Sequence, residues 1–150
     1  MEQLIVAPSL YFYLEGITSL KKIMEYAAPK VDLAYAEAER LGLEKTGPME
    51  FIYFGATADM EKEFTLQIAF PVKNTKALDN DFKFRQSPDF KCLKKNFKGT
   101  MADLGKEYEP MYEYIWNNSL KPSGEIREIY HLFEFPDSPN NVTEIQIGLM

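Results

Sequence analysis

The chain has 150 residues, which is enough for one compact domain and too few for two ordinary ones. Its 45% hydrophobic and 27% charged residues are typical of a globular protein and exclude a disordered one. Seventeen basic and 23 acidic residues give a formal charge of −6, which argues against a general nucleic-acid surface and suits a cationic ligand. We therefore expect no direct binding to nucleic acid.

The cysteine and histidine counts exclude several kinds of site. A single cysteine, Cys92, and a single histidine, His131, cannot form a disulfide framework or the usual zinc sites. The residues around Cys92 do not resemble an activated-thiol loop, so a catalytic Cys92–His131 pair is disfavoured. We expect neither a metal nor a cofactor. No apolar run approaches the roughly 18 residues of a membrane span and the N-terminus lacks a basic secretory start, which predicts a cytoplasmic protein without membrane contact.

The first half of the chain predicts a strand, a helix and two further strands. Residues 3–14 alternate in polarity and then become aromatic, as in a strand. Apolar residues recur at helical spacing from Leu20 to Leu41, which predicts an amphipathic helix that Pro29 bends or restarts and Gly42 ends. Residues 48–54 and 64–72 are predicted strands around a polar turn.

The second half predicts the same order of elements. Residues 90–97 form a strand, Thr100 caps a helix that Pro110 should kink, and residues 125–135 and 142–149 are the closing strands. The polar segment 73–88 is predicted to be a connector. Four lysines are interpreted as a solvated strand edge that limits aggregation and favours a monomer: Lys91, Lys94, Lys95 and Lys98.

The two halves also echo each other in sequence. The segment 66–70 returns as 145–149, Pro29 returns as Pro110, and 51–53 returns as 128–130, all in chain order. We therefore predict one α+β domain over residues 1–150, built from tandem duplicated β-α-β-β units with pseudo-two-fold symmetry. The first repeat covers about 1–72, the connector about 73–88 and the second repeat about 89–150. The helices should pack against an antiparallel sheet, with a ligand cavity between the repeats.

Glu128 is the leading candidate for a functional residue. It alternates with apolar neighbours and shares a strand face with Ile126, Tyr130 and Leu132. A carboxylate buried on such a face is costly unless a charge or hydrogen-bond donors meet it. It would then be a pocket anion for a cationic ligand or a general acid/base with a raised pKa. Alternatively Glu128 is exposed or pairs with a lysine, and periodicity leaves this open because the opposite face is also mixed.

Aromatic side chains are the second group of candidates. Tyr108, Tyr112 and Trp116 recur every four residues and form one stripe on the second helix. Such a stripe is either core or the wall of a pocket for planar or cationic molecules. First-half candidates for the same cavity are Tyr11, Tyr35 and Tyr53.

Nearly the whole chain resembles a known family in the order and spacing of its motifs. The matching second-half segments are 97–99, 112–116, 128–130 and 143–147, with Leu104, Tyr108 and Gly124 between them; the first half matches through 47–53 and 65–72. The sequence is similar to the GyrI-like small-molecule-binding domain, the effector-binding module of some multidrug-sensing transcription regulators.

The resemblance implies a tandem β-α-β-β fold and a pocket in which the acidic residue of a Glu-x-Tyr strand contacts cationic aromatic ligands. Glu128 occupies that position, and Tyr112, Trp116 and Tyr130 correspond to the pocket walls. The expected function is stand-alone binding of hydrophobic, cationic or planar small molecules, since no room precedes the domain for a helix-turn-helix. One alternative is a hydrolase that opens strained rings of DNA-alkylating natural products, with Glu128 and Tyr112 catalytic. Another is a protein-interaction module of the gyrase-inhibitor kind.

Overall fold

The computed structural model describes all residues from 1 to 150 and places eight strands in one antiparallel sheet. In chain order the elements are β1 (Glu2–Val6), β2 (Leu10–Ser19), α1 (Ile23–Arg40), β3 (Glu50–Phe54), β4 (Glu63–Pro71), β5 (Lys83–Gln86), β6 (Phe90–Lys98), α2 (Met101–Leu104), the 3-10 turn η1 (Gly105–Glu107), α3 (Tyr108–Asn117), β7 (Pro122–Leu132) and β8 (Val142–Leu149). None of the helices is both long and apolar enough to cross a membrane.

The strand order β1-β6-β8-β7-β3-β4-β2-β5 is symmetric about the β3–β7 pair. Each repeat contributes three neighbouring strands, which confirms the predicted α+β fold of duplicated β-α-β-β units. Each repeat also has an additional first strand that crosses to the other repeat: β1 pairs with β6, and β5 pairs with β2. The segment predicted to be only a connector therefore contains β5.

The position of β1 at one edge of the sheet corrects two further predictions. The strand predicted over 3–14 is two strands, which pair with different partners and are separated at Pro8. Because β1 covers β6, the lysines of β6 do not form a sheet edge, and two of them pair with carboxylates: Lys94 with Glu144 at 3.7 Å and Lys95 with Glu107 at 2.5 Å. The lysines of β6 thus give no reason to expect a monomer, and the monomer stays a prediction.

The two prolines act differently on their helices. Helix α1 continues through Pro29, whose ring is exposed, and it ends where Gly42 adopts a φ of +64°. In the second repeat the predicted single helix is divided. Thr100 caps α2 by accepting a hydrogen bond from the Asp103 N–H at 3.2 Å, and η1 then precedes α3. Pro110 lies in the first turn of α3, where its missing N–H costs nothing, so α3 restarts the helix instead of continuing α2.

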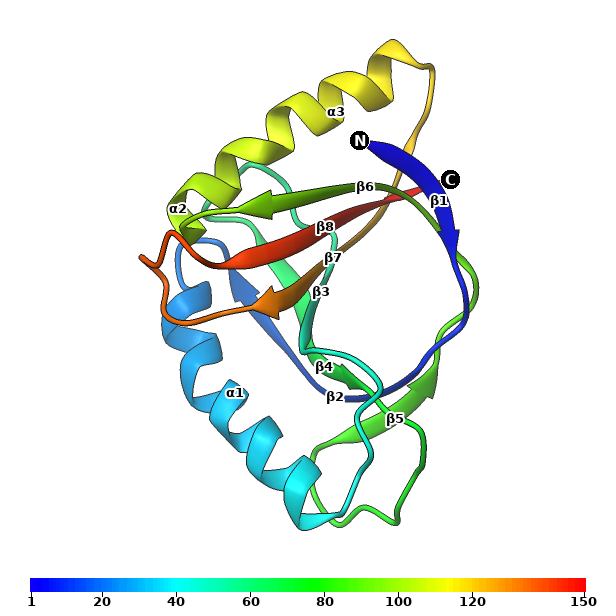
Figure 1. Cartoon of the computed structure of the whole chain (residues 1–150), viewed down its shortest axis with the longest axis vertical. Helices are drawn as coiled ribbons and strands as arrows, with labels where there is room; N and C mark the ends of the chain where they lie inside the picture. The colour runs from blue at the N-terminus through cyan, green and yellow to red at the C-terminus, as the bar shows by residue number, and fades with distance from the viewer.

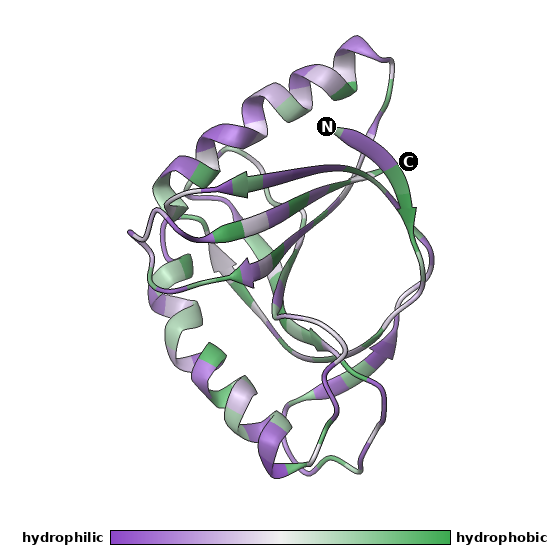
Figure 2. Cartoon of the chain, in the orientation of Figure 1, coloured by the Kyte–Doolittle hydropathy of each residue, from purple (hydrophilic) through white to green (hydrophobic).

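The helices cover one face of the curved sheet, and the opposite, concave face is free of helices (Figure 1). The fully buried residues of α1 are all small, namely Ala27, Ala34 and Ala38, which lets this helix approach the sheet closely. Both helices alternate between hydrophilic and hydrophobic positions (Figure 2), as expected for helices with one solvated side. One hydrophobic cluster lies under α1 and a second under α3. The central β3–β7 pair lies between the two helices and carries the candidate site.

A close approach around a glycine of β8 predicts a stability effect. A Cβ atom on Gly148 of β8 would lie 2.2 Å from Ser123 Oγ, 2.7 Å from the Glu125 carbonyl oxygen and 2.8 Å from a ring carbon of Phe90. Gly148→Ala should therefore lower the free energy of unfolding by about 1–3 kcal/mol, measured by urea denaturation. Gly105→Ala is the control, because nothing lies within 4 Å of its Cβ position, and it should not destabilise the protein. Equal free energies for the two variants would contradict the prediction.

Candidate functional site

Glu128 lies on β7, in the middle of the sheet, on the face that the helices cover. Its neighbours across the ladder are Phe51 of β3 and Ile145 of β8. Only 6% of the residue is exposed, so the alternative of a surface carboxylate is wrong. None of the ion pairs of the protein includes Glu128, so it is not paired with a lysine either.

Three tyrosine hydroxyls surround this carboxylate. Tyr53 of β3 and Tyr130 of β7 donate to Oε1 of Glu128 at 2.8 and 2.7 Å, and Tyr108, the first residue of α3, donates to Oε2. We call these four residues the carboxylate–tyrosine cluster. They come from both repeats and from both strands of the central pair, so the cluster lies at the junction of the two repeats.

The electrostatics of the cluster keep the hydroxyls as donors. Burial, and then the negative charge of Glu128, raise the pKa of Tyr53, Tyr108 and Tyr130 well above the ordinary value. A carboxylate has about four acceptor positions, and three of those on Glu128 are used. One acceptor position on Oε2 is therefore not used by a donor of the protein.

Aromatic rings extend the cluster. Phe51 meets Tyr130 edge-on with ring centroids 5.1 Å apart, and Phe64 lies 5.5 Å from Tyr53. Neither phenylalanine was predicted as a site residue, although Phe51 alternates with Tyr53 along β3 and so shares its face. The rings present faces that attract planar or cationic groups.

The other predicted site residues make no hydrogen bond to Glu128. Tyr112 is half-buried one turn beyond Tyr108, and its ring is 5.7 Å from that of Trp116, which is 64% exposed. Tyr35 is exposed on α1, where it packs edge-on against Phe70. Tyr11 is buried on the concave face of the sheet, so the sheet separates it from the carboxylate–tyrosine cluster.

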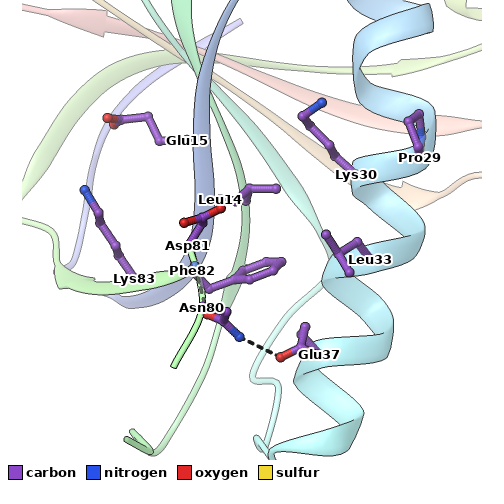
Figure 3. A pocket seen from close by; sticks show the side chains of 10 residues that line it. All are labelled: Leu14, Glu15, Pro29, Lys30, Leu33, Glu37, Asn80, Asp81, Phe82 and Lys83. Atoms are coloured by element: carbon purple, nitrogen blue, oxygen red, sulfur yellow. Dashed lines mark hydrogen bonds between the residues drawn. The ribbon is translucent and has the colours of Figure 1, made fainter. Parts of the chain in front are cut away.

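A separate groove of about 760 Å³ lies between α1 and the β2–β5 edge. Leu14, Leu33 and Phe82 form its apolar part, and charged side chains of both signs line the rest (Figure 3). Glu37 is already engaged there by Arg40 at 2.9 Å and by the Asn80 amide at 2.7 Å. The groove offers no buried, unpaired charge, so the carboxylate–tyrosine cluster is the stronger candidate site.

The contact between Tyr53 and Glu128 predicts a measurable coupling. Tyr53→Phe removes one charge-assisted hydrogen bond to a buried carboxylate and should lower the free energy of unfolding by about 1.5–3 kcal/mol. The same substitution should cost less in a Glu128→Gln background, which a double-mutant cycle in urea measures. Tyr114→Phe is the control, since its hydroxyl only accepts an exposed bond from Gln3. Additive effects of Tyr53→Phe and Glu128→Gln would mean that the bond contributes nothing to stability.

The fold and the site together define an α+β domain with a buried acidic and aromatic centre between two repeats. The model of the GyrI-like small molecule binding domain matches residues 8–150, and the chain belongs to this family. Comparison with curated protein sequences gives no match.

Solved structures share the fold at low sequence identity. The crystal structure of the EcmrR C-terminal domain superposes with a TM-score of 0.80 at 18% identity, covering 99% of this chain and 96% of that one. EcmrR in its DNA complex matches equally well, but this chain spans only 56% of it. SAV2435 bound to tetraphenylphosphonium has a TM-score of 0.69 at 14% identity, covering 100% and 94%. A hydrolase encoded by lin2189 from Listeria innocua has a TM-score of 0.63 at 11% identity, covering 99% and 91%.

Proposed function

We propose that this chain binds hydrophobic small molecules that are cationic or planar and aromatic, with Glu128 as the counter-charge. The observation that carries the proposal is a buried carboxylate without any cationic side chain in contact, held in place by three hydroxyl groups. Burying a charge in this way costs free energy that hydrogen bonds offset only in part. A ligand cation would supply the missing opposite charge.

The surrounding rings determine which cations would fit. Tyr53, Tyr130 and Phe51 offer aromatic surface beside the carboxylate, and cation–π contact contributes roughly 0.5–2 kcal/mol. A small hydrated ion would gain little from these rings, whereas a hydrophobic cation would bury apolar area against them. Tyr112 and Trp116 would extend the wall outward along α3. SAV2435, which shares the fold, binds tetraphenylphosphonium, a cation of this kind.

The test is calorimetric titration with tetraphenylphosphonium and with neutral triphenylphosphine oxide, which has similar rings and no net charge. We expect the cation to bind more tightly by at least about tenfold, or roughly 1.4 kcal/mol. Equal affinity for both compounds would refute the counter-charge role. Binding of neither compound would refute the proposed function for ligands of this class.

A second candidate function is hydrolysis, and the contact between the Tyr108 hydroxyl and Glu128 favours it. A buried carboxylate next to phenolic hydroxyls can accept a proton from an attacking water, as a general base does. Tyr112, the predicted partner of Glu128, makes no hydrogen bond to it, so Tyr108 is better placed for that role. A fold neighbour is described as a hydrolase. Incubation with a cyclopropane-containing DNA-alkylating compound tests this function, because turnover should disappear in Glu128→Gln while binding of the intact compound persists.

A further inference from the structure

The concave face of the sheet carries a second polar cluster, on the side away from Glu128. Tyr11 of β2 lies at its centre: its hydroxyl accepts a hydrogen bond from Nη1 of Arg127 at 3.2 Å and donates one to Oε1 of Glu50 at 2.9 Å. Arg85 of β5 lies next to Tyr11 in register and donates from Nε to the Gln67 amide oxygen at 2.9 Å. We call these five residues the arginine cluster.

The two guanidinium groups of this cluster lie against aromatic rings. Cζ of Arg85 is 5.0 Å from the centroid of the Tyr11 ring, and Cζ of Arg127 is 5.6 Å from the same centroid. Arg127 also lies 3.8 Å from the centroid of Phe90. Both guanidinium groups therefore lie next to the same ring, although β5 and β7 are far apart in the strand order.

Positive charge in the arginine cluster is not balanced. Arg127 pairs with Glu125 at 2.7 Å, but no carboxylate lies within ion-pair distance of Arg85. Burial raises the pKa of Glu50 to about 7, which removes part of its negative charge at neutral pH. One guanidinium thus lacks a counter-ion.

Two nitrogen atoms also lack hydrogen-bond partners. Nη2 of Arg127 and Nη2 of Arg85 are both buried and have no acceptor in the protein, and Arg127 as a whole is only 1% exposed. Buried polar groups are nearly always satisfied, and an unmade bond is costlier for a charged donor than for a neutral one. These two donors therefore require an acceptor that the polypeptide does not supply.

We propose that the arginine cluster binds a small monovalent anion, which accepts hydrogen bonds from Nη2 of Arg85 and Nη2 of Arg127. An anion supplies both the acceptor and the missing negative charge, whereas a water molecule supplies only the acceptor. Tyr11, Gln67 and Arg127 are at most 5% exposed, so a site among them suits an anion the size of a halide or a small carboxylate such as formate. This site is independent of the carboxylate–tyrosine cluster, which lies across the sheet.

Anomalous diffraction from crystals of the full chain grown with sodium bromide tests the site directly. We expect an anomalous peak beside the two Nη2 atoms. A second crystal grown with sodium formate tests whether a small carboxylate also binds. Planar density beside the two Nη2 atoms would extend the site from halides to carboxylates. A water molecule at this position in both crystals, without anomalous signal, would overturn the proposal.

Thermal unfolding gives a second readout in solution. Sodium chloride at 100 times its dissociation constant should raise the Tm by about 5 °C over sodium gluconate at equal ionic strength, because gluconate is too large to enter. Arg85→Gln should abolish this difference; Arg85 is half-buried on an edge strand, so the variant should fold. Lys83→Gln is the matched control, as it removes an exposed charge from the same strand and should retain the difference. An unchanged chloride effect in Arg85→Gln would contradict the proposal.

Discussion

Glu128→Gln is expected to weaken the binding of tetraphenylphosphonium between about tenfold and a hundredfold, which corresponds to roughly 1.4–3 kcal/mol. Glutamine keeps the size of the side chain and one acceptor oxygen, and it removes the charge. An ion pair in a pocket that is largely closed to water is worth more than a surface pair, whose median is about 0–1 kcal/mol. The affinity for triphenylphosphine oxide should stay within about threefold, because this ligand has neither a net charge nor a hydrogen-bond donor to pair with the Glu128 carboxylate.

Glu144→Gln is the matched control for this substitution. Glu144 is a partly buried carboxylate on the neighbouring strand β8, but it lies on the concave face, where it pairs with His131 at 2.9 Å and Lys94 at 3.7 Å. It changes the net charge equally and should leave the affinity for the cation unaltered. Similar losses in both variants would show that long-range charge, and not contact with Glu128, governs binding. An equal loss for the cation and the neutral compound in Glu128→Gln would also reject the counter-charge role.

The sequence correctly predicted that Glu128 shares a strand face with Ile126 and Tyr130, but it could not predict which side chains meet the Glu128 carboxylate. Strand periodicity alone places Ile126, Glu128 and Tyr130 on one side, as observed. The sequence could not show which of these two sides faces the helices, because both sides of β7 are buried. One side lies under the helices and the other inside the curve of the sheet. Tyr53 reaches Glu128 only through the β3–β7 pairing between the two repeats, a long-range contact that no local pattern encodes.

Tyr11 was predicted to line the same cavity as the aromatic stripe of the second helix, but it lies on the concave face of the sheet. In β2 two alternating sets of side chains, one with Phe12 and one with Tyr11 and Tyr13, are all buried, so burial could not be inferred from alternation. The short strand β5 was missed for a related reason. Lys83 and Gln86, its two ends, are exposed, and a four-residue edge strand with polar ends has the composition of a loop. Curvature and edge pairing are tertiary effects, and only the assembled sheet defines them.

Glu50→Gln is expected to change how stability depends on pH. Glu50 of β3 is 7% exposed, and burial raises its pKa from 4.5 to about 7 against the opposing effects of the Tyr11 hydrogen bond and the Arg127 charge. Between these two pH values the folded protein holds a proton that the unfolded chain has released. The stability from this proton is therefore fully present below about pH 4.5 and is lost as the pH rises through about 7. The loss is on the order of 3 kcal/mol, from 1.36 kcal/mol for each pKa unit.

Glutamine resembles the protonated acid and keeps an acceptor for the Tyr11 hydroxyl, so the variant should lose this pH dependence. Urea denaturation at pH 4.5, 6 and 8 should give curves that converge at the lowest pH and separate at the highest, where Glu50→Gln is the more stable protein. Glu39→Gln, an exposed change on α1, controls for the loss of one carboxyl group. Parallel pH profiles for wild type and Glu50→Gln would mean that Glu50 is ionised throughout this range. It would then serve as a counter-ion for the arginine cluster, which would remove the charge argument for a bound anion.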